Sequence, residues 1–468
     1  MNRSLCYGVA MAAVVAACGV AAYAQGAAPA AAAPSAPRYQ VNPLWPQPLA
    51  NLPNHWVLGS VSGVAVDAND HVWIVHRGAD ALEGNEKGMM ATPPSSSVCC
   101  VAAPAVLEFN QQGMYVSGFG GKELGFTNWP QSTGGIAVDS KGNVWVAAYG
   151  LDPAPAGGRG RGAAADDPDN PAPARGRAAA PAAGAAPQAR GAAPAAGAAA
   201  PAARGGRGAA PAAAPVAADA QVTKFSRSGE FVLQIGKAGS AGTPDSTTLL
   251  NRPAGIGLDE AASEVYVADS GNHRIAVFDS NTGAFKRAWG GSGEKPTADG
   301  AGKYDPAAPA SKQFRDPFCV KIAKDGMVYV CDRSSDRIQV FRKDGTFVKE
   351  MVIAKETTGA TATIGNLALN SSGSVWDIAF SSDPQQRYLF VADGHNDRVR
   401  ILRRDTLAEA GQVGDGGRQP GRFLTPGSVA VDSHGNLYTG EQHHAKRVQK
   451  FTPVVAAAAA PAAAAPAR

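Results

Sequence analysis

Two arginines and a small set of histidines are the residues of this chain that could do chemistry at one place. Arg77 and Arg333 each come directly after a run of apolar and β-branched residues, in VWIVHRG and VYVCDR. Histidines follow similar runs further along the chain: His273, His395, His443 and His444. A guanidinium binds a carboxylate in bidentate fashion, and grouped histidines can hold zinc. The chemistry open to these residues is anion binding, metal binding or both.

Common catalytic motifs are absent from the sequence. It contains no G-x-S-x-G nucleophile elbow, no H-E-x-x-H pair, no P-loop and no C-x-x-C pair. A metal site would have to come from histidines, and His395, His443 and His444 are the candidates. Each arginine could instead form an ion pair with a carboxylate of its own repeat unit, such as that of Asp80 or Asp336.

These residues are positioned by a sequence motif that the chain repeats six times. Each copy is a short apolar strand, a polar turn and a second β-branched and aromatic strand, and most copies continue into a third strand. The copies begin at Gly63, Gly135, Gly255, Cys319, Trp376 and Ser428. Small sheets that are repeated around an axis form a β-propeller. We predict an all-β, six-bladed β-propeller of four-stranded antiparallel blades over residues 39–453.

The ring is expected to close through the N-terminal part of the chain. Blade 6 offers only three strands before an Ala/Pro tail at 454–468, whereas Tyr39–Leu49 is a spare segment. Adding this segment to the last blade would remove the open sheet edges. Polar residues at recurrent repeat positions are expected to hold turns: Asp67, Asp139, Asp259, Asp269, Asn272, Arg274, Asn396, Arg398 and Asp432.

The four strands of each blade are lettered a to d from the axis outward. Four long connections are expected on one face of the propeller, because links between strands b and c and links between blades share a face. They cover 78–104, 151–220, 292–313 and 354–372, and long loops are usually functional or disordered. Arg77 and Arg333 follow strand b in blades three steps apart. We therefore expect them to face each other across the axis, where they would bind a small anion.

The first 24 residues have the pattern of a secretory signal peptide. Arg3 precedes an apolar run at Leu5–Val20, and Ala22-Tyr23-Ala24 forms a cleavage site. Val15-Ala16-Ala17-Cys18 also resembles a bacterial lipobox, which would leave Cys18 lipidated. The protein is expected to be exported, as a periplasmic or secreted protein or as a lipoprotein. An Ala/Pro-rich linker follows at 25–38, and we expect no transmembrane segment after it.

A low-complexity insertion at 151–220 accounts for the charge of the chain. The formal net charge is +4, and this insertion holds seven arginines against three aspartates between 153 and 218. It lacks the apolar residues that offset the entropy of ordering, so we expect it to be disordered within blade 2. The remainder is close to neutral, which does not favour nucleic acid as a partner.

Cysteine spacing indicates one candidate disulfide, as is common in exported proteins. Cys319 and Cys331 lie on the first two strands of one blade, and counting outward from the turn at Asp325-Gly326 places them nearly opposite each other. Cys99 and Cys100 are adjacent in a long loop. For them, free thiols, a bridge to a partner and a vicinal ring are all open.

The repeats resemble NHL repeats, as in VYVADSGNHRIAVFDSNTGAF and VYVCDRSSDRIQVFRKDGTFVKE. NHL propellers are platforms for binding proteins, RNA or ligands. One branch is enzymatic: the peptidyl-α-hydroxyglycine α-amidating lyase domain, which splits a hydroxyglycine-extended peptide into an amide and glyoxylate. VSGVAVDANDHVWIVHRG and CDRSSDRIQVF are similar to segments of that lyase. The resemblance implies that Arg77 and Arg333 stand where the lyase has two active-site arginines.

The rest of the lyase apparatus is not matched. Its three zinc histidines fall at residues without a donor atom for zinc, which are Gly134, Phe318 and Gly427. Ser428 replaces an aspartate that would help to hold calcium, and Ser270 and Gly271 stand where the lyase has its catalytic tyrosine. Without a Lewis acid and a base, this cleavage loses the interactions that contribute most to its rate. Zinc or calcium held elsewhere stays open.

The expected function is therefore a binding module with lyase-like ancestry. It would bind a small anionic ligand, a peptide or a protein of the cell envelope through the loop-decorated face. The alternative is a divergent metal-dependent lyase or hydrolase that uses Arg77, Arg333 and a relocated histidine site. The candidate ligand-binding residues are Arg77, Arg333, His273, His395, His443 and His444.

Overall fold

The computed structural model describes the chain from residue 36 to residue 454 with internal gaps. The described ranges are 36–48, 55–82, 84–96, 98–126, 129–130, 132–149, 219–357, 362–364, 367–369, 373–442 and 445–454. The expected signal peptide, the linker before residue 36, the insertion at 151–218 and the tail after 454 lie outside these ranges. His443 and His444 also lie outside them.

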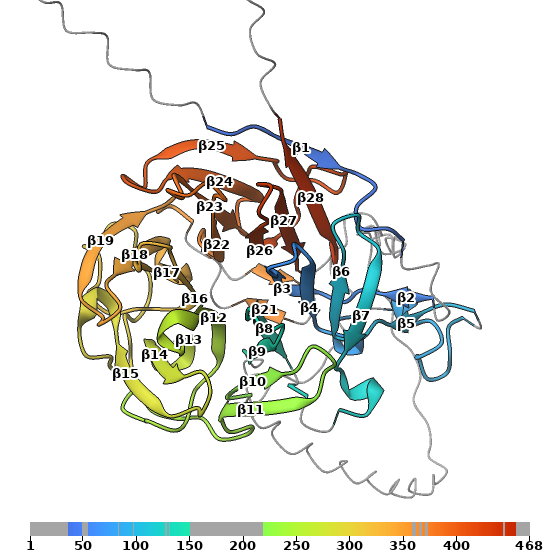
Figure 1. Cartoon of the computed structure of the whole chain (residues 1–468), viewed down its shortest axis with the longest axis horizontal. Helices are drawn as coiled ribbons and strands as arrows, with labels where there is room; N and C mark the ends of the chain where they lie inside the picture. Colours follow the sequence, from blue (N-terminus) through green and yellow to red (C-terminus); the bar gives the residue numbers. More distant parts are fainter. Residues whose placement is uncertain are drawn as a thin grey trace, which may run out of the picture. The chain divides into compact units, whose positions relative to one another are not determined.

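Six four-stranded antiparallel sheets surround a central axis (Figure 1), which confirms the predicted propeller. Blade 1 consists of β3 (Val61–Val66), β4 (Val72–His76), β6 (Val106–Phe109) and β7 (Tyr115–Phe119). Blade 2 consists of β8 (Thr133–Val138), β9 (Val144–Ala148), β10 (Gln221–Phe225) and β11 (Phe231–Gly236). Blade 3 consists of β12 (Pro253–Asp259), β13 (Glu264–Asp269), β14 (Arg274–Asp279) and β15 (Phe285–Trp289).

The remaining blades repeat this meander. Blade 4 consists of β16 (Pro317–Ile322), β17 (Val328–Asp332), β18 (Arg337–Phe341) and β19 (Phe347–Val352). Blade 5 consists of β22 (Asp377–Phe380), β23 (Tyr388–Asp393), β24 (Arg398–Arg403) and β25 (Glu409–Val413). Blade 6 consists of β26 (Pro426–Val431), β27 (Leu437–Glu441), β28 (Val448–Pro453) and β1 (Tyr39–Asn42). The first strands of neighbouring blades contact one another around the axis.

The N-terminal strand closes the ring as predicted. β1 pairs antiparallel with β28, and Tyr39 lies opposite Pro453 while Asn42 lies opposite Lys450. Just after β1, the Trp45 ring packs 5.0 Å from the ring of Tyr438 in blade 6. The same ring lies 5.9 Å from Phe109 in blade 1. This segment therefore joins the last blade to the first.

Short elements decorate the connections. β2 (Trp56–Val57) pairs in parallel with β5 (Val101–Ala102), and β20 (Ala362–Ile364) pairs antiparallel with β21 (Leu367–Leu369). The 3-10 helices are η2 (Ala79–Ala81), η3 (Gly84–Lys87), η4 (Lys122–Leu124), η5 (Glu260–Ala262), η6 (Ser270–Asn272), η7 (Gly291–Gly293) and η8 (Arg333–Ser335). Over the described residues, no helix has both the length and the apolar character needed to cross a membrane.

The turns between strands a and b hold neighbouring blades together. Asp67 accepts backbone hydrogen bonds from Asn69 and His71, both at 2.9 Å. Turn contacts of this kind recur at Asp139, Asp259 and Asp432, as the repeat pattern predicts. At two of these turns the next blade supplies a cation to the carboxylate: Arg227 pairs with Asp67 at 3.4 Å, and Lys343 pairs with Asp259.

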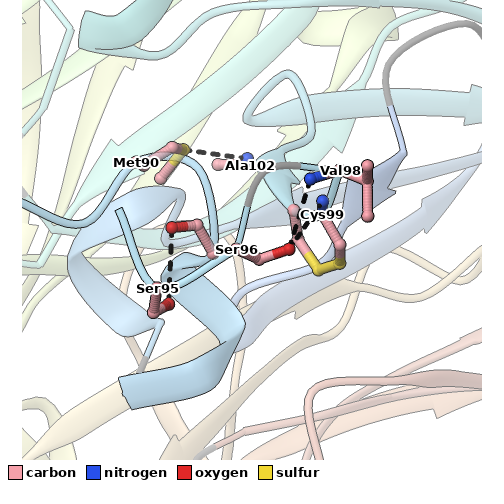
Figure 2. The surroundings of a disulfide bond; sticks show 8 residues. Met90, Ser95, Ser96, Val98, Cys99 and Ala102 are labelled. Carbon is pink, nitrogen blue, oxygen red and sulfur yellow. Dashed lines mark hydrogen bonds between the residues drawn. A yellow bond between two sulfur atoms is a disulfide. The ribbon is translucent and has the colours of Figure 1, made fainter. Parts of the chain in front are cut away.

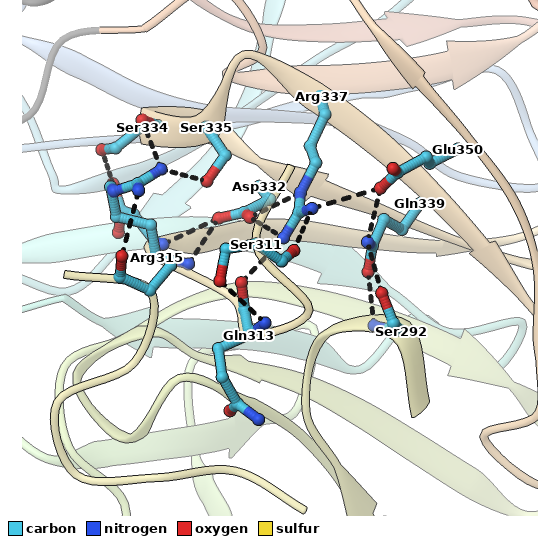
Figure 3. Close-up of polar contacts among 12 residues, drawn as sticks. Ser292, Ser311, Gln313, Arg315, Asp332, Ser334, Ser335, Arg337, Gln339 and Glu350 are labelled. Carbon is cyan, nitrogen blue, oxygen red and sulfur yellow. Dashed lines mark hydrogen bonds and ion pairs between the residues drawn. The ribbon is translucent and has the colours of Figure 1, made fainter. Parts of the chain in front are cut away.

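The 292–313 connection is fixed to blade 4 by two arginines (Figure 3). Arg337 pairs with Asp332 at 2.9 Å and donates to the carbonyl oxygens of Ser311 and Gln313 at 2.6 and 2.7 Å. Arg315 donates to carbonyl oxygens of the same connection, those of Ala301, Gly302 and Lys303. Guanidiniums that donate to several carbonyl oxygens hold a loop in one geometry. This connection therefore forms a fixed wall on the loop-decorated face.

Candidate functional site

The ends of strand b and the starts of strand a come together on the loop-decorated face. The backbone of Arg77 donates to the Ser60 carbonyl at 2.9 Å, and that of Arg333 donates to the Asp316 carbonyl at 3.0 Å. The residues that directly follow strand b in the six blades are Arg77, Tyr149, Ser270, Arg333, Gly394 and Gln442. The repeat thus arranges one residue from each blade around this end of the axis.

Arg333 is buried among aromatic rings and a carboxylate. Its Nε and Nη2 donate to Oδ2 of Asp316 at 2.8 and 2.7 Å, and both side chains are about 5% exposed. The guanidinium carbon lies 3.7 Å from the ring centre of Phe318 and 4.7 Å from that of Trp376. Burial opposes the charge of Arg333, but Asp316 and Tyr149 outweigh it and raise the pKa. The group therefore stays a cation inside the fold.

Tyr149 links the two predicted arginines, although it is not among the residues expected from the sequence. It follows β9 in blade 2, and its hydroxyl accepts a hydrogen bond from Nη2 of Arg333 at 3.0 Å. The Tyr149 ring lies 5.2 Å from that of Phe318, and the Arg252 guanidinium carbon lies 5.6 Å from the Tyr149 ring centre. A phenol hydroxyl therefore sits within a group of guanidiniums.

Arg77 belongs to the same group. Its Nε donates to the carbonyl oxygen of Thr133 in blade 2 at 3.4 Å, and part of the side chain reaches solvent. Burial lowers the pKa of Arg77 to about 10; Tyr149 opposes the shift and the like charge of Arg333 adds to it. The two arginines thus lie within electrostatic reach of each other. We call Arg77, Tyr149 and Arg333 the arginine–tyrosine cluster.

Ion pairs with Asp80 and Asp336 were the alternative that the sequence suggested for the two arginines. Arg333 does pair with a neighbour in its own blade, but this partner is Asp316 at the start of strand a and not the suggested Asp336. Asp336 instead turns towards blade 5, where its Oδ1 accepts from the Ser374 backbone at 2.7 Å. The side chain of Asp80 is not among those described. The described carboxylates form no ion pair with Arg77.

The three positions of the family's zinc histidines do not fit a metal. A Cβ atom on Gly134 would lie 2.7 Å from the carbonyl oxygen of Ala254, and one on Gly427 would lie 2.4 Å from Nε2 of Gln442. The third position, Phe318, places an aromatic ring against Arg333. Zinc needs N, S or O donors. These residues supply none; at Gly134 the backbone of Ala254 leaves no room for a side chain, and at Gly427 the space is filled by the side chain of Gln442.

Not all of the histidines that were predicted from their positions after strands lie at the arginine–tyrosine cluster. His273 donates through Nδ1 to the carbonyl oxygen of Arg315 at 2.9 Å, which ties it to the residues just before β16. His395 is exposed. Because His443 and His444 lie outside the described residues, a metal site built from them stays a prediction.

The described residues contain one other group with the donor spacing of a metal site. Ligand atoms of Asp67, His71 and Glu108 lie within 4.8 Å of one another. The Arg227 guanidinium from blade 2 contacts all three side chains. A cation of the protein thus already balances these carboxylates. We assign this group to the joining of blades 1 and 2.

Turn residues of the D-x-x-N-x-R pattern make the structural contacts expected of them. Asn272 and Arg274 donate to the buried Asp269 carboxylate at 2.7 and 2.8 Å. In blade 5, Asn396 donates to the Asp393 carboxylate at 2.9 Å, and Arg398 donates to Gln412 at 2.9 Å. These groups hold the b–c turns in place.

Both cysteine pairs form disulfides in the structure. Cys319 and Cys331 lie directly opposite each other on β16 and β17, with Cα atoms 4.9 Å apart. Of the possibilities open for Cys99 and Cys100, the structure has the vicinal ring (Figure 2). The hydroxyl of Ser96 accepts from the backbone of Cys99 at 3.1 Å. This ring lies in the 78–104 connection.

Comparison with known proteins agrees with this architecture. The family model described as NHL repeat matches residues 250–278. "Peptidyl-glycine alpha-amidating monooxygenase A" of Xenopus laevis is 27% identical over 208 residues, which are 43% of this chain and 19% of that protein. This chain therefore matches about a fifth of the length of that relative.

Solved structures with similar folds are remote in sequence. A structural genomics protein of unknown function from Bacteroides thetaiotaomicron is 13% identical, with a TM-score of 0.45, over 85% of this chain and 70% of that one. Virginiamycin B lyase from Staphylococcus aureus is 11% identical, with a TM-score of 0.38, over 89% of this chain and 88% of that one. Likeness at this level carries no inference about function. The chain is a six-bladed β-propeller that contains an NHL repeat at residues 250–278 and has distant homology to peptidyl-glycine α-amidating monooxygenase.

Proposed function

We propose that this protein is an exported propeller that binds a small anionic ligand, or the carboxylate of a peptide, at the arginine–tyrosine cluster. The observation that carries the proposal is the placement of Arg77 and Arg333 within electrostatic reach of each other, beside the Tyr149 hydroxyl. The alternative partner is a protein of the cell envelope, which would bind through the same face.

Charge supports an anion as the ligand. Like charges in a desolvated place destabilise each other, and an anion that enters between them offsets this cost. Asp316 balances Arg333, whereas Arg77 meets the Thr133 carbonyl oxygen and part of its side chain reaches solvent. A carboxylate could therefore approach Arg77 directly and accept from Tyr149 on its other side.

Calorimetric titration with N-acetylglycine and N-acetylglycinamide tests the proposal. The acid should bind to the wild-type protein and the amide should not, because only the acid carries a carboxylate. Arg77→Gln should weaken binding of the acid at least tenfold. Arg387→Gln is the matched control, since Arg387 pairs with Asp383 and is about half exposed. Equal binding of acid and amide, or full binding by Arg77→Gln, would rule the proposal out.

A lyase or hydrolase is the second candidate, and Tyr149 is the observation that favours it. A phenol hydroxyl held by one guanidinium and near another is suited to transfer a proton. The test is incubation with an α-hydroxyglycine-extended peptide, with glyoxylate measured in wild type and in Tyr149→Phe. Metal analysis of wild type and His443→Ala shows whether a relocated metal site takes part. Glyoxylate that depends on Tyr149 would favour the enzyme over the binding module.

Export is the proposal for the cellular location, and it rests on residues 1–24 of the sequence. The intact mass of the mature protein tests it. Cleavage after Ala24 would give a chain that begins at Gln25, whereas a lipoprotein would begin at a modified Cys18. Retention of Met1 would contradict both.

A further inference from the structure

The two disulfides of this protein differ in how easily a reductant can reach them. Cys319 and Cys331 are 3% and 0% exposed, on the first two strands of blade 4. Cys99 is partly exposed, and Cys100, to which it is bonded, is 8% exposed. Thiol–disulfide exchange requires a thiolate to approach one sulfur of the bond, so access decides which disulfide opens first. The disulfide of Cys99 and Cys100, which we call the vicinal ring, is the more accessible one.

The vicinal ring is not needed to hold the propeller together. Its two cysteines are adjacent in the chain, and a disulfide restricts the unfolded chain less when the loop that it closes is shorter. Both cysteines lie in the 78–104 connection, outside the six four-stranded sheets. Opening the ring should therefore act on this connection and leave the blades folded.

The vicinal ring fixes the middle of its connection (Figure 2). The Ser96 hydroxyl accepts from the backbone of Cys99 at 3.1 Å. Cys100 forms a parallel β-bridge with Met89. A Cβ atom on Gly88 would lie 1.9 Å from the carbonyl oxygen of Cys99, so the two backbones are in direct contact. The ring therefore holds two stretches of the connection against each other.

A short path of contacts runs from the vicinal ring to Arg77. β5 directly follows the ring and pairs with β2. The buried side chain of His76 contacts the chain just after both strands. Its Nε2 donates to the Pro104 carbonyl oxygen at 2.9 Å, and its Nδ1 accepts from the Gly59 backbone at 3.1 Å. Because His76 immediately precedes Arg77, a change at the ring can reach the arginine–tyrosine cluster.

We propose that the vicinal ring is a reversible redox switch, which a dithiol opens to loosen the 78–104 connection and weaken anion binding at Arg77. A thiolate of the dithiol attacks the sulfur of Cys99, the S–S bond breaks, and the sulfur of Cys100 leaves as a thiolate that takes up a proton. The second thiol of the reductant then attacks the mixed disulfide, forms the reductant's own disulfide and releases Cys99 as a thiol. The protein gains two electrons and two protons.

Hydrogen–deuterium exchange of the native full-length protein tests the switch. Millimolar dithiothreitol should open the vicinal ring and leave the Cys319–Cys331 disulfide closed, which alkylation and peptide mass spectrometry would show. Amides of β5 and of residues 84–96 should then exchange on the order of tenfold faster, while those of the blade strands keep their rates. Joint replacement Cys99→Ser and Cys100→Ser should give the faster exchange without reductant. The matched control, Cys319→Ala with Cys331→Ala, should keep the response of the connection to reductant.

The effect on the anion site rests on the proposed function and is measured separately. Calorimetric titration with N-acetylglycine should show about fivefold weaker binding to the reduced protein, and reoxidation should restore the affinity. Exchange that stays unchanged after the ring opens would overturn the switch, as would an affinity equal in the two forms. A vicinal ring that opens no faster than Cys319–Cys331 would overturn it too. If neither form binds N-acetylglycine, the proposed function fails, and faster exchange would still support a switch within the connection.

Discussion

Replacing Arg333 with methionine should destabilise the protein by about 3–5 kcal/mol. Arg333 and Asp316 form an ion pair at 2.7 Å, with both side chains about 5% exposed. Removing one partner of a buried pair leaves an uncompensated charge, and this is the cost measured in such cases. Methionine keeps most of the side-chain volume between Phe318 and Trp376. The expected loss therefore comes from Asp316 rather than from a cavity.

The same substitution should change how stability depends on pH. In wild type, burial raises the pKa of Asp316, but Arg333 and Ser270 outweigh it and hold that pKa below the usual value. This contribution is present at neutral pH and is lost as pH falls through the folded pKa. In Arg333→Met, burial acts without the cation, so the pKa of Asp316 rises. The variant should then lose stability as pH rises above about 4.

Urea unfolding followed by tryptophan fluorescence at pH 5 and pH 7.5 measures both effects. Arg333→Met should be more stable at pH 5 than at pH 7.5, and adding Asp316→Asn should recover most of the loss at pH 7.5. Arg387→Gln is the control, because its exposed pair with Asp383 should contribute less than about 1 kcal/mol. A loss below about 1 kcal/mol in Arg333→Met, or a pH slope equal to that of wild type, would refute this reasoning.

Three further predictions concern binding and stability. Affinity for N-acetylglycine, measured by calorimetry, should be constant from pH 7 to 9 and fall as pH rises through the Arg77 pKa of about 10; an affinity unchanged at pH 11 would show that Arg77 keeps its charge there and would contradict the lowered pKa. Joint replacement of Cys319 and Cys331 by alanine should lower the free energy of unfolding by about 3 kcal/mol, because the disulfide closes a short loop; a loss below about 1 kcal/mol would contradict this. Burial raises the pKa of Asp336 to about 7, so stability should fall as pH rises from 4 to 7, and Asp336→Asn should flatten this slope in urea unfolding; an unchanged slope would assign it to other groups.

The repeat pattern was sufficient to predict the fold because strand alternation and turn chemistry act locally. The predicted pairing of Tyr39 onward with blade 6 is confirmed by β1 and β28, since an open sheet edge had no other strand to close it. Counting from the turn at Asp325-Gly326 also placed Cys319 opposite Cys331. Register in an antiparallel hairpin follows from the turn, so such counts transfer directly to the structure.

The site was harder to predict because it depends on where side chains point. Tyr149 stands four residues after Trp145, just as Arg77 stands four residues after Trp73. This shared register was the signal that could have found Tyr149. The family pattern places its tyrosine in blade 3 and so directs attention to Ser270 instead. Which carboxylate meets Arg333 was not fixed by spacing either, since it depends on which blade each loop faces.

The residues around the propeller axis also show why a metal ion and the aromatic rings cannot occupy the same end of the axis. Phe318 stands at a zinc position of the family and places its ring 3.7 Å from the Arg333 guanidinium carbon. Gly394 leaves room for Trp376 on the same cation, since a Cβ there would lie 2.7 Å from that ring. Phe318 and Trp376 thus enclose a guanidinium that is already paired with Asp316, at a place where the family has a zinc ligand. Restoring histidine at 318 alone would not restore zinc, because the backbone leaves no room for a side chain at Gly134. The proposed anion binding at this end of the propeller would therefore depend on arginine.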